Sequence, residues 1–189
     1  MIVVNLRDLL DYRGRACESD MAKTRPFTQT SSLVSMGGIV TTSAPNAYTQ
    51  VEVQLPLSSL DQEVFVVTDI EFTLDAPEAI AVTDTFTAVQ VTTSTQAGML
   101  AINSPAVIGK ELIAIKQGVV GLSQTNPGDS YSTGSSSDYI SIIATPNYFI
   151  AVQGGNNTGT TTGACRVRGF RAKAQAAAYA ALVTEELNQ

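Results

Sequence analysis

Apolar and polar residues alternate over long stretches of this chain, a period typical of β-strands that bury one face. The clearest case is residues 63–74, where the even-numbered positions from Val64 to Leu74 are mostly apolar, and Asp69, Glu71 and Thr73 share the opposite face. The same period, with enrichment in β-branched residues, predicts further strands. They lie near Leu33–Thr42, Val51–Leu55, Thr83–Thr93, Glu111–Lys116, Asp138–Ala144, Tyr148–Gln153 and Ala164–Phe170.

Turn-forming residues separate these strands. Pro56 and Pro77 end two of them, because proline cannot donate to a central β-ladder. Residues 145–147 predict a hairpin turn between the two strands on either side. Two polar stretches, Ser123–Asp138 and Gly154–Gly163, predict surface loops at one end or rim of the fold, because a core cannot satisfy their backbone groups.

The apolar spacing changes to three and four residues near the C-terminus, which predicts a helix over about residues 172–187. The residues that recur at this spacing are Ala172, Ala176, Tyr179, Val183 and Leu187. Glu185 and Glu186 lie at the helix C-terminus, where the helix dipole disfavours them. We therefore expect an external cation or a neighbouring subunit to compensate. The narrow stripe fits packing either on the chain's own strands or on another subunit.

Strands in series followed by a single helix predict an all-β protein with one sandwich or barrel domain. The expected organisation is an N-terminal arm over residues 1–27, a β-sandwich over residues 28–171 and a C-terminal helix over residues 172–189. No apolar run is long enough to predict a membrane span.

The composition indicates a surface that meets other protein. Of the 189 residues, 44% are hydrophobic and only 15% are charged, whereas a typical soluble domain has about 25% charged residues. A monomer relies on surface charge to remain soluble and separate from its neighbours. Self-association is the preferred interpretation, and a sparingly charged secreted monomer is the alternative.

The residue types that are missing argue against enzymatic function. The chain has no His and no Trp, so it lacks the commonest general base and Ser-His-Asp or HExxH chemistry is impossible. Cys17 and Cys165 are too far apart in sequence for a zinc motif and are interpreted as buried thiols or a disulfide. The acidic run from Asp61 to Asp84 fits no calcium-binding motif, although a calcium site is an alternative. We expect no catalytic residue, no transition-metal site and no cofactor.

Cations cluster at the two ends of the chain, and the segment between them is acidic. Clustered Lys and Arg are candidates for contact with nucleic acid or an acidic partner, and salt bridges to acidic neighbours are the alternative. The candidates are Arg7, Arg13, Arg15, Lys23, Arg25, Arg166, Arg168, Arg171 and Lys173.

The N-terminal segment, Met1 to about Phe27, is too apolar for a free tail, and we expect it to pack against a neighbouring subunit. Packing on its own sandwich is the competing hypothesis. Together with the helix, this gives a set of candidate residues for a subunit interface. They are Ile2, Val3, Val4, Leu6, Leu9, Leu10, Tyr179, Val183 and Leu187.

Two segments carry a resemblance to a known family. The strand V-F-V-V-T-D-I-E-F and the ending R-V-R-G-F-R-A-K-A before a helix, with low charge and long Ser/Thr/Gly loops, resemble a jelly-roll capsid protein of a small tailless icosahedral virus. The resemblance covers about residues 30–189. It implies a single antiparallel jelly roll of about eight strands, whose loops and terminal arms mediate subunit contacts. The N-terminal segment departs from the strongly basic arm of many coat proteins, which puts genome packaging by this segment in doubt.

The resemblance implies a major capsid protein that is located in the virion and assembles with copies of itself, with other virion proteins as candidate partners. One alternative is a virion decoration, spike or fibre-knob protein, which would trimerise without forming a closed shell. A second alternative is an extracellular sugar- or receptor-binding module, which would be a monomer with a concave aromatic face. Electron microscopy of the purified protein discriminates among the three.

Overall fold

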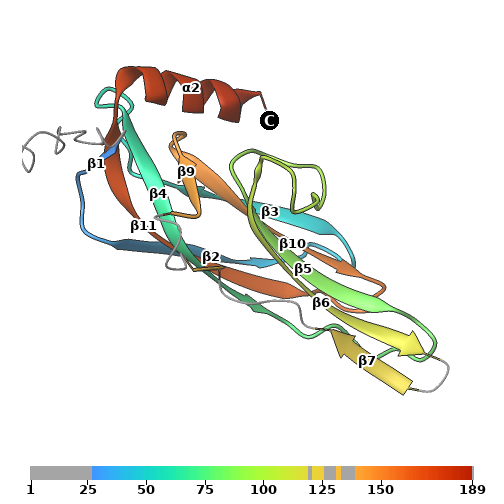
Figure 1. Ribbon diagram of the computed structural model, residues 1–189. Coiled ribbons are helices and arrows are strands. Elements are labelled where there is room, and N and C mark those ends of the chain that lie inside the picture. The colour runs from blue at the N-terminus through green and yellow to red at the C-terminus, as the bar shows by residue number, and fades with distance from the viewer. Residues whose placement is uncertain (1–26, 119–120, 126–130, 133–138, 189) are drawn as a thin grey trace, which may run out of the picture.

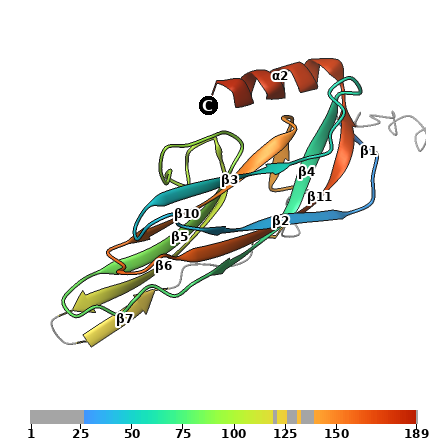
Figure 2. The same cartoon turned by 180° about the vertical axis from the view of Figure 1, so that it is seen from behind.

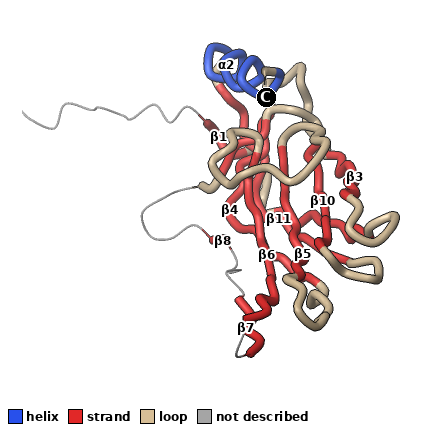
Figure 3. Tube along the Cα trace, turned by 90° about the vertical axis from the view of Figure 1, so that its right-hand side faces the viewer, coloured by secondary structure: helices blue, strands red, loops and turns tan. Residues whose placement is uncertain are grey.

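The computed structural model describes residues 27–118, 121–125, 131–132 and 139–188, which form two antiparallel sheets and one helix (Figure 1; seen from behind in Figure 2). Sheet A contains β1 (Phe27–Gln29), β2 (Val34–Thr41), β4 (Glu63–Leu74), β8 (Tyr131–Ser132), β9 (Ser141–Ile143) and β11 (Thr162–Ala174). Sheet B contains β3 (Tyr48–Gln54), β5 (Thr85–Thr92), β6 (Val107–Gly118), β7 (Gly121–Thr125) and β10 (Asn147–Gly155). The helix, α2, spans Ala176–Leu187 and lies across one end of the sandwich (Figure 3).

The strand order is that of a jelly roll. Sheet A has the order β2-β11-β4-β9 and sheet B the order β3-β10-β5-β6, with β1, β7 and β8 as short additions. The antiparallel pairs are nested along the chain: β2 with β11, β3 with β10, β4 with β9 and β5 with β6. This is the two-sheet arrangement of a jelly roll. The predicted fold class, an all-β antiparallel sandwich with one C-terminal helix, is confirmed.

The inner faces of the two sheets form the main core. Phe65, Ile70 and Val167 of sheet A pack with Val89 and Ile150 of sheet B, and all five side chains are fully buried. Burial of a large apolar side chain contributes about 1.5–3 kcal/mol, so this layer supplies most of the force that holds the sheets together. The predicted alternation in β3 holds in part: Val53 packs on the core and Glu52 is exposed, but Val51, expected on the same face as Val53, is 41% exposed.

A β-bulge divides β4 into two parts, and the residues that face the core are odd-numbered in the first part and even-numbered in the second. Arg168 pairs with Asp69, but the next residue, Gly169, pairs with Val67. Thr68 is therefore an extra residue that pairs with no residue of β11. An extra residue exchanges the two faces of a strand. The sequence analysis placed all even-numbered residues of β4 on one face. That placement is wrong at the start of the strand, where Phe65 and Val67 face the core.

The exchange of faces creates a second apolar cluster, on the outside of sheet A. Val64 and Val66 of β4 point outward and meet Ala172 and Ala174 of β11, and all four are buried. The cluster is covered by α2, whose packing residues are Tyr179, Leu182 and Val183. The helix therefore shields from water the apolar side chains on this outward-facing part of the sheet.

Three local predictions differ from the structure. The helix begins at Ala176 rather than Ala172, because Ala172–Ala174 remain in β11, where all three pair with β1 and the first two also pair with β4. β9 and β10 do not form a hairpin, since β9 pairs with β4 in sheet A and β10 with β3 and β5 in sheet B. The stretch Ser123–Asp138 is not loop throughout, because β7 extends to Thr125 and β8 lies within it.

Gly169 tests the bulge. A Cβ at this position would collide with the Val66 carbonyl oxygen and approach the Phe65 ring to 2.8 Å. Such overpacking typically costs about 1–3 kcal/mol, so Gly169→Ala should lower the free energy of unfolding by at least that amount in a chemical denaturation experiment. The matched control is Gly98→Ala, because a Cβ there meets nothing within 4 Å. Equal stability of the two variants would contradict the tight packing at the bulge.

Candidate self-association surface

The outer face of sheet A carries a ladder of ion pairs beyond the bulge. The antiparallel register places Arg168 opposite Asp69 and Arg166 opposite Glu71. Arg168 donates to Asp69 at 2.8 Å and to Glu71 at 2.7 Å, and Arg166 lies 3.3 Å from Glu71. Alternating arginines on one strand and alternating acids on its neighbour thus neutralise each other across the sheet.

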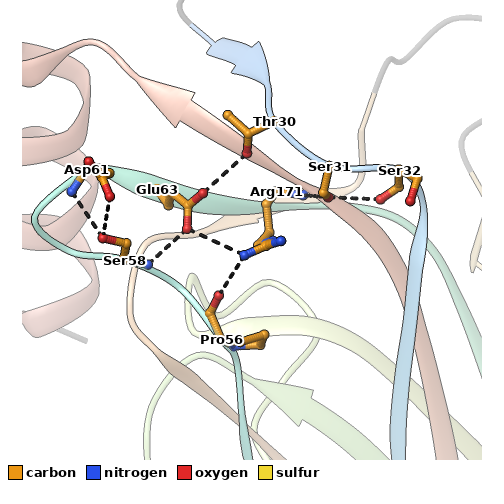
Figure 4. A network of polar contacts seen from close by, with 8 residues as sticks. All are labelled: Thr30, Ser31, Ser32, Pro56, Ser58, Asp61, Glu63 and Arg171. Atoms are coloured by element: carbon orange, nitrogen blue, oxygen red, sulfur yellow. Dashed lines mark hydrogen bonds and ion pairs between the residues drawn. The ribbon is translucent and has the colours of Figure 1, made fainter.

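Arg171 belongs to a second polar network, near the α2 end of the sheet (Figure 4). Its guanidinium lies 3.8 Å from the Glu63 carboxylate and donates to the Pro56 carbonyl oxygen at 3.3 Å. Its backbone N–H donates to the Ser31 hydroxyl at 2.9 Å, and the Ser58 N–H donates to Glu63 at 3.0 Å. These contacts fix the connection between β1 and β2 against the β3–β4 loop and β11.

Three of the candidate contacts for an acidic partner therefore have carboxylate partners within the subunit: Arg166, Arg168 and Arg171. Lys173 is exposed at the end of β11. The remaining candidates lie outside the described residues, and they are Arg7, Arg13, Arg15, Lys23 and Arg25. Partly exposed pairs of this kind contribute about 0–1 kcal/mol each. A phosphate group could bind the paired arginines only in competition with these carboxylates.

A shallow groove of about 610 Å³ lies beside the ladder, along β2 and the neighbouring part of β11. Gly37 and Ala164 are among the smallest residues of its lining, and a Cβ at Gly37 would collide with the Cys165 carbonyl oxygen. Ile39 lines the groove with 72% of its surface exposed. The sequence analysis missed Ile39, although the uncharged run of β2, V-S-M-G-G-I-V-T, was available as a signal.

The cysteine thiol that lines this groove is unreactive. Cys165 lines it but is 4% exposed and lies in the core, and burial raises the pKa of its thiol, which keeps the thiol protonated. Burial likewise raises the pKa of Tyr148, which is fully buried in the same core. In the described part of the chain, no three His, Cys, Asp or Glu side chains gather closely enough to hold a metal ion.

The helical interface candidates divide into two groups. Tyr179 and Val183 pack on sheet A of their own chain, whereas Leu187 is 75% exposed at the end of α2. The other candidates lie outside the described residues, and they are Ile2, Val3, Val4, Leu6, Leu9 and Leu10. Two exposed apolar residues that the sequence analysis missed are Leu60, in the β3–β4 loop, and Ile102, in the β5–β6 loop. Within the described residues no helix is both long enough and apolar enough to cross a membrane.

Glu186 attaches the C-terminal half of α2 to the turn between β9 and β10. Its carboxylate is 7% exposed and accepts hydrogen bonds from the N–H groups of Ala144 and Thr145, both at 2.8 Å. The chain itself thus supplies donors where an external cation or neighbour was expected. Burial raises the pKa of Glu186, although the hydrogen bonds oppose this. Its stabilising effect is therefore greatest in acid and declines as the pH rises above the ordinary carboxyl range.

The loops at the end opposite α2 are held together by side-chain amides. Asn157, which is 4% exposed, donates to the Phe86 carbonyl oxygen at 2.9 Å and accepts from the Glu78 N–H at 3.0 Å. The Asn46 side-chain amide also bonds to the backbone of Asn157: it donates to the Asn157 carbonyl oxygen and accepts from the Asn157 N–H. The Glu78 carboxylate accepts from the N–H groups of Thr158 and Gly159 at 2.9 and 2.8 Å. The loop between β10 and β11, which the structure shortens from the predicted Gly154–Gly163 to residues 156–161, therefore uses its amides on a carboxylate of its own chain.

Comparison with known proteins does not assign the chain to a family. It matches no known protein-family model, and no curated protein is significantly similar to it. The function is therefore argued from the fold and from the surface described above.

The attachment of α2 is tested by replacing Glu186. Glu186→Ala leaves two buried N–H groups without an acceptor, which costs about 1–3 kcal/mol of unfolding free energy. The neighbouring variant Glu185→Ala is the control, because Glu185 is exposed and its loss should change stability by less than about 0.5 kcal/mol. Denaturant unfolding measures both variants, and a harmless Glu186→Ala would contradict the attachment.

The loop contacts of Glu78 predict a pH dependence. Hydrogen bonds from Thr158, through its hydroxyl and N–H, and from Gly159 lower the pKa of Glu78. Because the folded pKa is below the ordinary value, the stabilisation is present above that value and is lost as the pH falls. The amide NMR signals of Thr158 and Gly159 should therefore shift together on acidification. They should not do so in Glu78→Gln, and identical titrations in both proteins would contradict the assignment.

Proposed function

We propose that this chain is a structural subunit that assembles with copies of itself, and that the assembly is the icosahedral shell of a virus particle. The observation that carries the proposal is a jelly-roll strand order in a chain where four of the six described cations pair with carboxylates of the same subunit. The fold supplies a rigid building block, and the weakly charged surface supplies a reason for the blocks to associate.

The surface of the subunit is sparsely charged. Only 15% of the residues are charged, and Lys116, Arg166, Arg168 and Arg171 each pair with a carboxylate. Lys110 donates to the carbonyl oxygen of Leu100. The chain keeps a net charge of −6, so it is the low share of charged residues, rather than neutrality, that favours contact between protein surfaces.

Rigidity at both ends of the sandwich supports the same proposal. Loops are ordinarily the mobile part of a fold, but here Asn157 and Glu78 join three loops at one end. At the other end, α2 is attached through Glu186 and the apolar cluster beneath Tyr179. A subunit that must fit several neighbours at fixed angles benefits from ends of fixed shape.

The proposed role is structural rather than enzymatic, and a role in genome packaging through the described arginines has little support. Release of Arg166 or Arg168 for a phosphate would leave Asp69 or Glu71 without a partner on the same face, and these acids would repel nucleic acid. Contact between copies of the chain requires no such rearrangement.

Sedimentation velocity and negative-stain electron microscopy of the purified full chain test the proposal. We expect closed particles of uniform diameter that contain many copies, because self-association through the subunit surface should continue until the shell closes. Discrete trimers would favour a decoration or fibre-knob protein instead. A stable monomer at micromolar concentration would favour a binding module and contradict the proposal.

A further inference from the structure

β2 forms an edge of sheet A. It pairs with β11 from Val34–Gly169 to Thr41–Thr162, and among the described residues no other strand pairs with it. In an edge strand, alternate residues direct their N–H and C=O groups away from the sheet. β2 therefore offers a row of backbone donors and acceptors along its length.

This edge lacks the features that usually prevent pairing with another chain. Natural edge strands are commonly protected by a charged residue, a proline or a very short length. β2 has eight residues, none of them charged and none of them proline. Its most exposed large side chain, Ile39, is apolar and lies next to the groove. An edge of this composition is suited to accept a further strand.

A second copy of β2 is the occupant that fits this edge. Two identical edges that meet about a two-fold axis are necessarily antiparallel, which matches the rest of the sheet. The same patch then faces itself, and the absence of charge on β2 means that no like charges meet. A charged or strongly polar partner would find no complementary group along this strand.

The side chains along the groove indicate which residues of the two copies would pair. Residues directly opposite each other in an antiparallel pair must lie on the same face of the sheet. A two-fold axis at Gly38 places Gly37 opposite Ile39, and Ser35 opposite Thr41. Each exposed Ile39 then lies beside the other copy's Gly37, which lines the groove and has no side chain to oppose it.

We infer that two copies of this chain join edge to edge through β2, antiparallel about a two-fold axis at Gly38, and so make one continuous sheet from two copies of sheet A. This rests on the proposed function, for which it names the contact between subunits. Within each subunit, β2 is held by its pairing with β11, and the segment before it is held by the bond from the Arg171 N–H to the Ser31 hydroxyl.

Engineered disulfides test the register directly. Ser35 and Thr41 are both exposed, and at about 3.3 Å per residue they are about 20 Å apart within one strand, too far to bridge. In a Cys17→Ser background, Ser35→Cys with Thr41→Cys should therefore give a covalent dimer on mild oxidation, seen on non-reducing gels. Ser35→Cys alone and Thr41→Cys alone are the controls, and neither should cross-link. Absence of the dimer in the double variant, or dimers with either single variant, would overturn the inference.

A charge at the edge tests its contribution to assembly. Ile39→Lys places two like charges near the axis and should raise the concentration needed for association by about tenfold or more, measured by sedimentation. Ile102→Lys is the matched control, because Ile102 is 58% exposed but lies in the β5–β6 loop. Thermal unfolding of both variants confirms that each is folded. Equal assembly by the two variants would also overturn the inference.

These outcomes separate the inference from the proposed function. One outcome is that the full chain forms particles, the double-cysteine variant gives no cross-linked dimer and Ile39→Lys still assembles. That outcome would refute the β2 contact but not the shell-forming subunit. A disulfide-linked dimer from a chain that never forms particles would support the β2 contact and refute the shell.

Discussion

One extra residue in β4 determines how the rest of this molecule is arranged. Because Thr68 pairs with no residue of β11, the inward and outward faces of β4 are exchanged halfway along the strand. One half therefore carries an outward acidic face, which the arginines of β11 neutralise, and the other half carries an outward apolar face. That apolar face must be covered, and α2 covers it. The position of the helix, the division of sheet A and the small side chains of Ala172 and Ala174 all follow from the bulge.

The fold class was predictable because alternation along each strand is a local property of the sequence. The positions of most strands, the single helix and the all-β class follow from it, and so does the exposure of Glu52. The bulge was not predictable, because the even-numbered residues of β4 are apolar in both halves of the strand. Only the neighbouring strand, whose register on β4 shifts between Arg168 and Gly169, determines which face is inside.

The candidate surface was less accessible to sequence reasoning than the fold. Tyr179 and Val183 were recognised as a contact stripe, but periodicity cannot state whether the contact is within a chain or between chains. The exposure of Ile39 was not predicted, because an apolar residue in a strand is ordinarily assigned to the core. Its exposure follows from the geometry of β2, in which the buried neighbour Val40 occupies the inward position. The ion pairs of Arg166 and Arg168 required the register of β11 on β4.

The hydrogen bonds around Asn157 have a further consequence, for chemical ageing. Asparagine deamidates when the backbone nitrogen of the following residue attacks the side-chain amide carbon to form a cyclic imide. For Asn157 that nitrogen belongs to Thr158 and is held by Glu78, while the amide itself is held by Phe86. The preceding Asn156 is protected in the same way, because the nitrogen of Asn157 donates to Asn46. The contacts that fix the shape of this loop therefore also protect its covalent structure.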